Sequence, residues 1–445
     1  MKHANENRVI FSEFRQRVNS LASKAAAFRN DGVDMISKLP EARVFQILSL
    51  LPQRDVVTTS VLSKRWNTLW KMVPKLEFDY QQYKRSGDDE TFSEYVSRVL
   101  LSSKTPVLEC LHLRLSLDNC APMDIASWIG IAYARHVHEL ELDVIGPSSN
   151  IKLPIGLYYY ETLDTLKLKN SVLIDIPCQD CYLKALRTLH LCYVDYENDA
   201  SVVNFLSGRP KLENLVVNRR RWDYVKTFNI AVPSLQRLEI CDWNWNGQEK
   251  EEELGDYAIN VPSLKYLKIK GTRDIRFRLV EIAPEANVSD LQRSFISIKS
   301  LSSSLSEIAF PNYTIFHELV YLELCTSQAM WCNLLTLMIN TSPKLQVLKL
   351  IGCGWGYRKV RAGRWNQPKN VPECLETFVW NSCKEEQQEE EKKVVKYILG
   401  NANRLKKANI SIKGFNSHER LKMLEELESV VKASKSSCNS LLVAE

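Results

Sequence analysis

Side chains that could carry out chemistry are scattered along this sequence and form no catalytic motif. Cys178 and Cys181 form a C-x-x-C pair, a spacing that zinc sites use. His190 and Cys192 follow, but they lack the spacing of a second pair, so we favour small buried thiols over a zinc site. No phosphate-binding loop, nucleophile elbow or metalloprotease helix motif is present. The sequence therefore favours a protein that is not an enzyme and that holds no metal or cofactor.

Two clusters that combine arginine with tryptophan could instead bind a partner. Guanidinium groups beside indole rings can hold an acidic peptide, a phosphate or stacked bases. Each cluster comes just after an apolar strand pattern, so we expect both in loops on one side of the fold. Ordinary surface charge is the alternative interpretation. The clusters are Arg219, Arg220, Arg221 and Trp222, and Arg358, Arg361, Arg364 and Trp365.

Composition limits the class of protein. The 59 basic and 53 acidic residues leave a net charge of +6 that is spread along the chain. This is unlike the concentrated basic face of a nucleic-acid-binding protein. No apolar run approaches the roughly 20 residues that span a bilayer, and the first residues lack the apolar core of a secretory signal. We therefore expect neither nucleic acid nor membrane as a partner, a cytoplasmic or nuclear location, and reduced thiols at the 12 cysteines.

A leucine pattern recurs from about residue 105 and supplies the elements that must position these groups. Its period is close to the roughly 20–29 residues of leucine-rich repeats, in which each strand turns alternate side chains inward and neighbours stack into a solenoid. The register of the 274–318 stretch stays open. The copies begin at Leu108, Val137, Leu163, Leu186, Leu212, Leu235, Leu264, Leu305, Leu319, Leu345 and Leu375.

Residues 31–78 carry a dense apolar pattern of helical spacing. Pro40 suits a first helical position, and Pro52 stops that helix. Asp55 and Ser63 can cap a second and a third helix. Three short helices cannot bury all the apolar side chains that they carry. We therefore expect an exposed apolar face, the kind of surface that marks a partner site.

The stretch at 34–70, DMISKLPEARVFQILSLLPQRDVVTTSVLSKRWNTLW, closely resembles the F-box. The tail at 394–407, VVKYILGNANRLKK, resembles the FBD signature. Together with the repeats, the chain resembles the plant F-box/LRR-repeat proteins with a C-terminal FBD domain. The resemblance implies a substrate-recognition subunit of an SCF-type E3 ubiquitin ligase. In that family the F-box binds a Skp-type adaptor, through it a cullin and a RING subunit, and the repeats bind a target protein for ubiquitination.

The resemblance also implies which residues face the adaptor. Trp66 and Trp70 could instead join the F-box to the repeats. Arg43 stands where the family usually has an apolar residue, and a buried charge there would weaken adaptor binding unless its stem snorkels to the rim. The implied adaptor-binding residues are Leu39, Pro40, Ile47, Leu48, Leu51, Pro52, Val61, Leu62, Ser63, Arg65 and Trp66.

Two other functions stay open at this point. Arg43 could mark a scaffold that no longer engages a ligase. A small-molecule sensor could hold its ligand in the solenoid cup beneath a tryptophan. The tryptophans considered for that cup are Trp222, Trp243, Trp245 and Trp355.

The expected fold class is α/β, with a short three-helix F-box, a leucine-rich-repeat solenoid and an α+β FBD cap. We expect a last amphipathic helix over 417–431 with Leu421, Leu424, Leu427 and Val431 facing inward. The expected domains are an amphipathic N-terminal extension at 1–30, the F-box at 31–78, the repeats at 105–370 and the FBD domain at 371–445.

Overall fold

The computed structural model describes most of the chain after its N-terminal segment. It divides the chain into two compact units, Met1–Val73 with Ser102–Thr105, and Pro74–Leu101 with Pro106–Glu445. The described residues are 39–84, 90–146, 150–176, 183–207, 209–220, 225–242, 256–271, 276–280, 295–297, 316–326, 331–352, 365–382, 388–412, 417–434 and 440–444.

The first unit consists of short helices: α2 (Glu41–Leu48), α3 (Gln53–Thr58), η1 (Thr59–Val61), α4 (Lys64–Leu69) and η2 (Trp70–Met72). Ser63 caps α4 as expected, because its side chain accepts a hydrogen bond from the backbone N–H of Trp66 at 3.4 Å. The expected cap at Asp55 is wrong. Pro52 occupies the position before α3, and Asp55 lies within the first turn.

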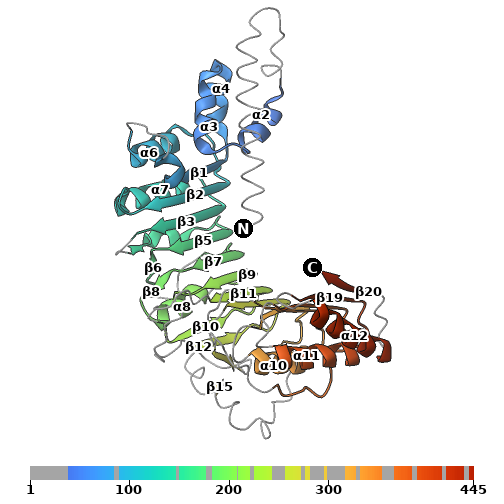
Figure 1. Ribbon diagram of the computed structural model, residues 1–445. Helices are drawn as coiled ribbons and strands as arrows, with labels where there is room; N and C mark the ends of the chain where they lie inside the picture. The colour runs from blue at the N-terminus through green and yellow to red at the C-terminus, as the bar shows by residue number, and fades with distance from the viewer. Residues whose placement is uncertain are drawn as a thin grey trace, which may run out of the picture. The chain divides into compact units, whose positions relative to one another are not determined.

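The second unit is built on one parallel sheet of 13 strands (Figure 1). Each expected leucine copy that lies in the described residues supplies one strand of this sheet. The remaining strands, β1, β19 and β20, come from segments outside the leucine pattern. The strands in spatial order are β1 (Lys75–Asp79), β2 (Cys110–Ser116), β3 (Glu139–Ile145), β5 (Thr165–Asn170), β7 (Thr188–Cys192), β9 (Asn214–Asn218), β11 (Arg237–Asp242), β13 (Tyr266–Gly271), β16 (Tyr321–Cys325), β17 (Val347–Ile351), β18 (Thr377–Ser382), β19 (Lys407–Ile412) and β20 (Ser440–Ala444).

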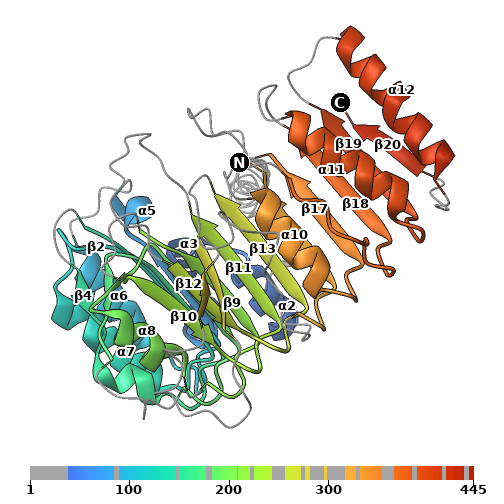
Figure 2. The same cartoon turned by 90° about the horizontal axis from the view of Figure 1, so that it is seen from below.

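Two smaller sheets and several helices form the return segments of the repeats. The smaller sheets are β4 (Ile151–Lys152) with β6 (Val172–Ile174) and β8 (Asp195–Tyr196), and β10 (Thr227–Ala231) with β12 (Asp256–Asn260), β14 (Arg276–Val280) and β15 (Phe295–Ser297). The helices are α5 (Tyr80–Lys84), α6 (Phe92–Ser102), α7 (Pro122–Ala134), η3 (Ile155–Tyr159), α8 (Asp199–Leu206), α10 (Trp331–Thr341), α11 (Gln388–Asn401) and α12 (Ser417–Ala433). Figures 1 and 2 show α7 and α8 along one face of the sheet, with α10 and α11 beside later strands.

Alternation along each strand builds the core of this unit. In β2, Leu111 and Leu113 are at most 1% exposed, while the side chains between them face the other side of the sheet. The register aligns Leu111 with Leu140 of β3, and Leu140 with Leu166 of β5. Apolar side chains therefore stack in continuous rows, as the solenoid expectation requires.

One expectation about the elements is wrong, and another lies outside the described residues. The latter is the copy that begins at Leu305; in the described main sheet β13 pairs directly with β16. Leu421 of α12 is 59% exposed, whereas Leu427 is fully buried as expected. Met423 fills the inward position instead, at 5% exposure.

The C-terminal region continues the main sheet. β17 pairs with β18, β18 with β19 and β19 with β20, all in parallel register. α11 connects β18 to β19, and α12 connects β19 to β20, which repeats the strand–helix–strand logic of the preceding units. The expected α+β cap is thus joined to the repeats through backbone hydrogen bonds.

Candidate functional site

Among the described residues of the first unit, the most exposed large apolar side chains are Leu50, Val61 and Leu62. Leu50 is 64% exposed, Val61 is 81% exposed and Leu62 is 58% exposed. Leu50 follows the end of α2, while Val61 and Leu62 lie at the end of η1. Apolar side chains exposed this far in a small helical unit are typical of a docking surface.

Two residues that the sequence assigned to the partner surface lie inside the protein. Leu48 is fully buried on the inner face of α2 beside Val44, and Trp66 is only 5% exposed. Trp70 is equally buried. Their side chains are therefore used within this chain, and neither indole is available as an anchor for another protein.

Leu39 and Arg65 are held together at the beginning of the first unit. The Arg65 guanidinium donates a hydrogen bond to the backbone carbonyl of Leu39 at 2.6 Å. Arg65 therefore fixes the segment that leads into α2 at Pro40, which itself is exposed. Its role in the chain is to position this segment.

Arg43 lies on the exposed side of α2, so its charge is not buried within this chain. Its guanidinium donates to the side chain of Gln46, three residues further along the helix, at 3.0 Å. Ile47 lies one turn later on the same side and is half-buried. The arginine head group is thus free to stay in water while its stem lies along the helix.

A second candidate surface is the open face of the main sheet, formed by the side chains that alternate with the buried rows. Half-buried charged groups of opposite sign face one another across its strands. The central row of this face reads Glu77, His112, Glu141, Lys167, His190, Val216, Glu239, Lys268, Glu323, Lys349, Val379 and Asn409.

Ion pairs neutralise most of this row. Glu239 contacts Lys268 at 3.1 Å, and the Arg237 guanidinium also bonds Glu239. Partial burial opposes ionisation of Glu239, but the hydrogen bonds from Arg237 and Lys268 outweigh it and lower the pKa of that carboxyl. His190 has cationic neighbours, and burial together with the charges of Lys167 and Lys169 lowers the pKa of its imidazole. The imidazole is therefore neutral at physiological pH.

Cys110 also lies on this open face, at the start of β2. Its Sγ lies 3.8 Å from Oε2 of Glu139, and Nε2 of His112 lies 3.1 Å from Oε1 of the same carboxylate. Burial, followed by the negative charge of Glu139, raises the pKa of the Cys110 thiol to about 11. Among the residues that the structure describes, this is the only group of three ligand-type side chains close enough to share a metal ion.

Only Arg219, Arg220 and Trp365 of the two arginine clusters lie in the described residues. Arg219 is 5% exposed, donates to the backbone carbonyl of Val225 at 2.6 Å and lies over the rings of Phe228 and Tyr257. Its expected place in a contact loop is therefore wrong, since the side chain packs in the interior of the repeats.

Of the other members of the two arginine clusters, only Arg220 and Trp365 lie in the described residues. Arg220 donates to the backbone carbonyl of Tyr193 at 2.6 Å and pairs with Asp195 at 3.4 Å. Trp365 is half-buried, with its ring edge-on to Tyr397. The residues outside the described ranges are Arg221, Trp222, Arg358, Arg361 and Arg364, and the same holds for Trp243, Trp245, Trp355, Cys178 and Cys181.

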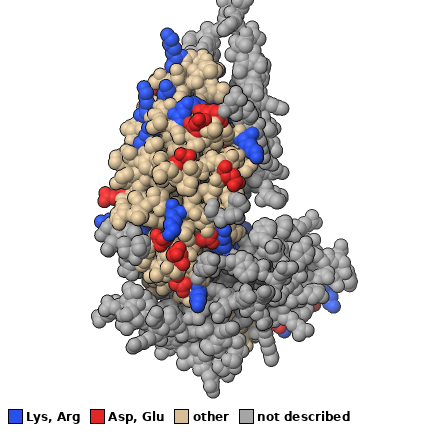
Figure 3. Space-filling view, turned by 90° about the vertical axis from the view of Figure 1, so that its left-hand side faces the viewer, with Lys and Arg blue, Asp and Glu red and all other residues tan. Residues whose placement is uncertain are grey.

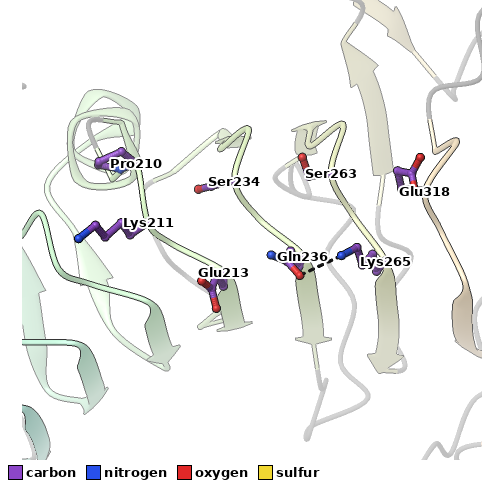
Figure 4. A pocket seen from close by; sticks show the side chains of 8 residues that line it. All are labelled: Pro210, Lys211, Glu213, Ser234, Gln236, Ser263, Lys265 and Glu318. Atoms are coloured by element: carbon purple, nitrogen blue, oxygen red, sulfur yellow. Dashed lines mark hydrogen bonds between the residues drawn. The ribbon is translucent and has the colours of Figure 1, made fainter.

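A polar groove of about 420 Å³ runs along the N-terminal ends of four neighbouring strands of the main sheet (Figure 4). The groove is open where two successive Pro-Ser-Leu turns carry only small side chains, Ser234 and Ser263. Lys265 donates a hydrogen bond to the side chain of Gln236 across it at 3.3 Å. The recurring Pro-Ser-Leu triplets are the sequence signal that could have located it. The lining residues are Pro210, Lys211, Glu213, Ser234, Gln236, Ser263, Lys265 and Glu318.

The side of the molecule seen in Figure 3 has mixed charge. Lys and Arg side chains are interspersed with Asp and Glu among many uncharged residues, without a basic stripe on the described part of this face. Across the described ranges, no helix combines the length and the apolar character needed to cross a membrane.

Comparison with known proteins accounts for all three regions of the chain. Residues 36–78 match the F-box domain model, residues 125–267 match the model described as FBD-associated F-box protein At5g56370, LRR repeats, and residues 367–410 match the FBD model. The putative F-box/FBD/LRR-repeat protein At4g13965 of Arabidopsis thaliana is 48% identical over 427 residues, which cover 92% of this chain and 97% of that protein. The chain belongs to the F-box/FBD/LRR-repeat family.

A second relative, the F-box/FBD/LRR-repeat protein At3g52680 of Arabidopsis thaliana, is 45% identical over 91% of this chain and 92% of its own length. The F-box match covers α2 to η2 of the first unit and ends within β1, so the last residues of that match already belong to the main sheet. The FBD match covers β18 and α11 and ends within β19. In this F-box/FBD/LRR-repeat protein the FBD segment is therefore a direct extension of the repeat sheet.

Proposed function

We propose that this protein is the substrate-recognition subunit of an SCF-type E3 ubiquitin ligase. Its F-box binds a Skp-type adaptor, which connects it to a cullin and a RING subunit. Its repeats bind a target protein. The protein itself performs no chemistry, because holding target lysines close to a charged conjugating enzyme raises their effective concentration. We place this assembly in the cytoplasm or the nucleus.

The exposed apolar group formed by Leu50, Val61 and Leu62 is the observation that supports this proposal most strongly. It lies in the unit that matches the F-box, and burying one such side chain on binding contributes about 1.5–3 kcal/mol. We propose these three residues as the central anchors of the adaptor interface. The surrounding residues of that interface are Leu39, Pro40, Ile47, Leu51 and Pro52.

The structure supports a different role for the other residues that the resemblance implied. Leu48 and Trp66 are buried, so they hold the F-box together. Ser63 and Arg65 fix the local backbone, through the cap of α4 and the bond to Leu39. Changes at these four positions would weaken adaptor binding through the fold.

Co-purification of the full chain with a Skp-type adaptor tests the proposal. We expect wild type to form a complex of equal stoichiometry, and Val61→Asp and Leu62→Asp to weaken it at least tenfold, since about 1.4 kcal/mol corresponds to a factor of ten. Met123→Asp is the matched control, because Met123 is 75% exposed in α7, outside the F-box. A wild-type chain that captures no adaptor, or equal capture by all four proteins, would overturn the proposal.

The target side of the proposal relies on the open face of the main sheet. Its half-buried charged groups offer a partner many directed polar contacts, and a partner of complementary charge would bind this face selectively. Glu239→Lys should therefore reduce target capture in proximity labelling without affecting adaptor capture. Unchanged labelling by this variant would place target binding on another surface.

A further inference from the structure

We propose that Cys110, His112 and Glu139 form a binding site for one Zn²⁺ ion on the open face of the main sheet. This site is independent of the adaptor-binding function. Cys110 and His112 are two residues apart on β2 and so project from the same face, and Glu139 lies directly across from Cys110 on β3. The three side chains are thus brought together by the register of two strands.

The distances between the three ligand atoms suit a tetrahedrally coordinated zinc ion. With a Zn–S distance of about 2.3 Å and Zn–N and Zn–O distances of about 2.0 Å, tetrahedral ligands lie about 3.3–3.5 Å apart. The Sγ of Cys110 and Oε2 of Glu139 are 3.8 Å apart, and Nε2 of His112 and Oε1 of Glu139 are 3.1 Å apart. All three ligand atoms lie within 4.8 Å of one another. Small side-chain rotations would bring them around a common centre.

The ligand types select the metal. Thiolate and imidazole favour zinc over magnesium and calcium, which prefer sites made of oxygen atoms. His112 is 30% exposed and Glu139 is 25% exposed, so an ion can enter from solvent and keep a water molecule at its fourth position. The Cys110 proton leaves to solvent when the sulfur coordinates the ion, so each zinc bound releases one proton.

Lys167 supplies the outer support that a metal-bound carboxylate needs. Its ammonium group lies 2.5 Å from Oε1 of Glu139 and 3.8 Å from the Glu141 carboxylate. When Oε2 of Glu139 binds the ion, Oε1 keeps the hydrogen bond from Lys167 and the carboxylate stays oriented. Glu141 offers the ammonium group a second partner during this adjustment.

The first test uses cobalt(II) as a coloured substitute for zinc, with the full-length protein free of chelators and affinity tags. We expect one equivalent of Co²⁺ to produce a thiolate-to-cobalt charge-transfer band that zinc then bleaches. Cys110→Ser, His112→Ala and Glu139→Gln should each remove this band. Cys192→Ser is the matched control, because Cys192 lies on the same open face but beside Lys169. A band that persists in Cys110→Ser, or is lost equally in Cys192→Ser, overturns the proposal.

A second measurement assigns the site without relying on colour. Iodoacetamide alkylation at Cys110, followed by peptide mass spectrometry, should slow at least tenfold when one equivalent of Zn²⁺ is present. In His112→Ala the same zinc should slow it by less than twofold. Circular dichroism of each variant shows whether it is folded. The decisive comparison is the alkylation rate of wild-type Cys110 with and without zinc, which needs no variant. Equal alkylation of wild-type Cys110 with and without zinc refutes the site.

Discussion

Tyr266 on β13 and Tyr321 on β16 stack face to face, with ring centroids 4.2 Å apart and ring planes 10° apart. The Arg237 guanidinium of β11 lies 3.7 Å from the centroid of the Tyr266 ring. β13 and β16 are adjacent in the sheet, although β14 and β15 come between them in the chain and belong to another sheet. The tyrosine pair therefore marks the place where the main sheet resumes after an insertion.

We expect the tyrosine pair to stabilise this junction measurably. In a double-mutant cycle, Tyr266→Leu and Tyr321→Leu should show a coupling of about 0.5–1.5 kcal/mol in the free energy of unfolding, as aromatic pairs do. Urea denaturation measures it. Tyr266→Leu combined with the distant Tyr158→Leu should be additive to within about 0.5 kcal/mol. Additivity in both combinations would show that the stack contributes nothing of its own.

Leu48 and Leu50 are two residues apart and should respond in opposite ways to truncation. Leu48→Ala empties a fully buried position and should lower the free energy of unfolding by about 2–5 kcal/mol. Leu50→Ala should change it by less than about 0.5 kcal/mol but weaken adaptor capture. Denaturation and co-purification of both variants separate the two effects. Strong destabilisation by Leu50→Ala would contradict its assignment to the docking surface.

Arg43→Leu should change adaptor affinity by less than about threefold. The guanidinium is exposed and bonded to Gln46, so its stem can lie against an adaptor while the charged head group stays in water. Isothermal titration with a Skp-type adaptor measures the change, with Glu41→Leu in the same helix as the control. A change from no detectable binding to tight binding would instead support the scaffold interpretation of the wild-type chain.

Arg219 and Arg220 are neighbours in sequence but should differ in their effect on stability. Arg219→Ala removes a buried charged donor from the Val225 carbonyl, and such bonds contribute about 1.5–3 kcal/mol. Arg220→Ala should cost less, because its partners remain partly hydrated. Urea denaturation of the two variants provides the comparison, and equal losses would contradict the interior role of Arg219.

Glu391 of α11 should make stability fall as pH rises. It is 3% exposed and accepts a hydrogen bond from the Trp380 indole at 2.8 Å, and burial raises the pKa of its carboxyl above the ordinary 4.5. The folded state thus holds this proton more tightly than the unfolded state. The contribution is fully present below the ordinary carboxyl pKa and is lost as pH rises through the higher value of the folded state.

Glu391→Gln keeps an acceptor for Trp380 but cannot ionise. We expect it to raise the melting temperature at neutral pH by about 2 °C or more and to flatten the pH dependence above the ordinary carboxyl pKa. Differential scanning calorimetry across this range measures both. An unchanged slope in Glu391→Gln would mean that burial does not raise the pKa of the Glu391 carboxyl.

The strands of the main sheet could be predicted because their signal is local. In a copy such as Leu108-x-x-Leu111-x-Leu113, the alternation itself determines which side chains turn inward. The site of Cys110 with Glu139 could not be found in this way, because it depends on which residues lie opposite each other across two strands. The spacing of cysteine and histidine residues along the chain, taken alone, therefore predicts no metal site.

The F-box was predictable as a set of helices but less so as a surface. Leu48 and Leu50 are equally apolar, and only the position of each around the end of α2 separates the buried side chain from the exposed one. Arg219 illustrates the same difficulty, since arginine usually lies in solvent but here packs over Phe228 and Tyr257. Tertiary packing determines which of these side chains are buried, and a helical or repeat pattern in the sequence carries no information about that packing.

The unbroken sheet has a practical consequence for shortened versions of this protein. A chain cut before β18 would leave the backbone groups along one edge of β17 without partners, on the strand sequence Val-Leu-Lys-Leu-Ile. Exposed edges of this kind recruit other strands, so such fragments would tend to aggregate. The C-terminal strands keep β17 paired and move the open edge of the described sheet to β20, so binding experiments with isolated repeats would need a substitute partner for β17.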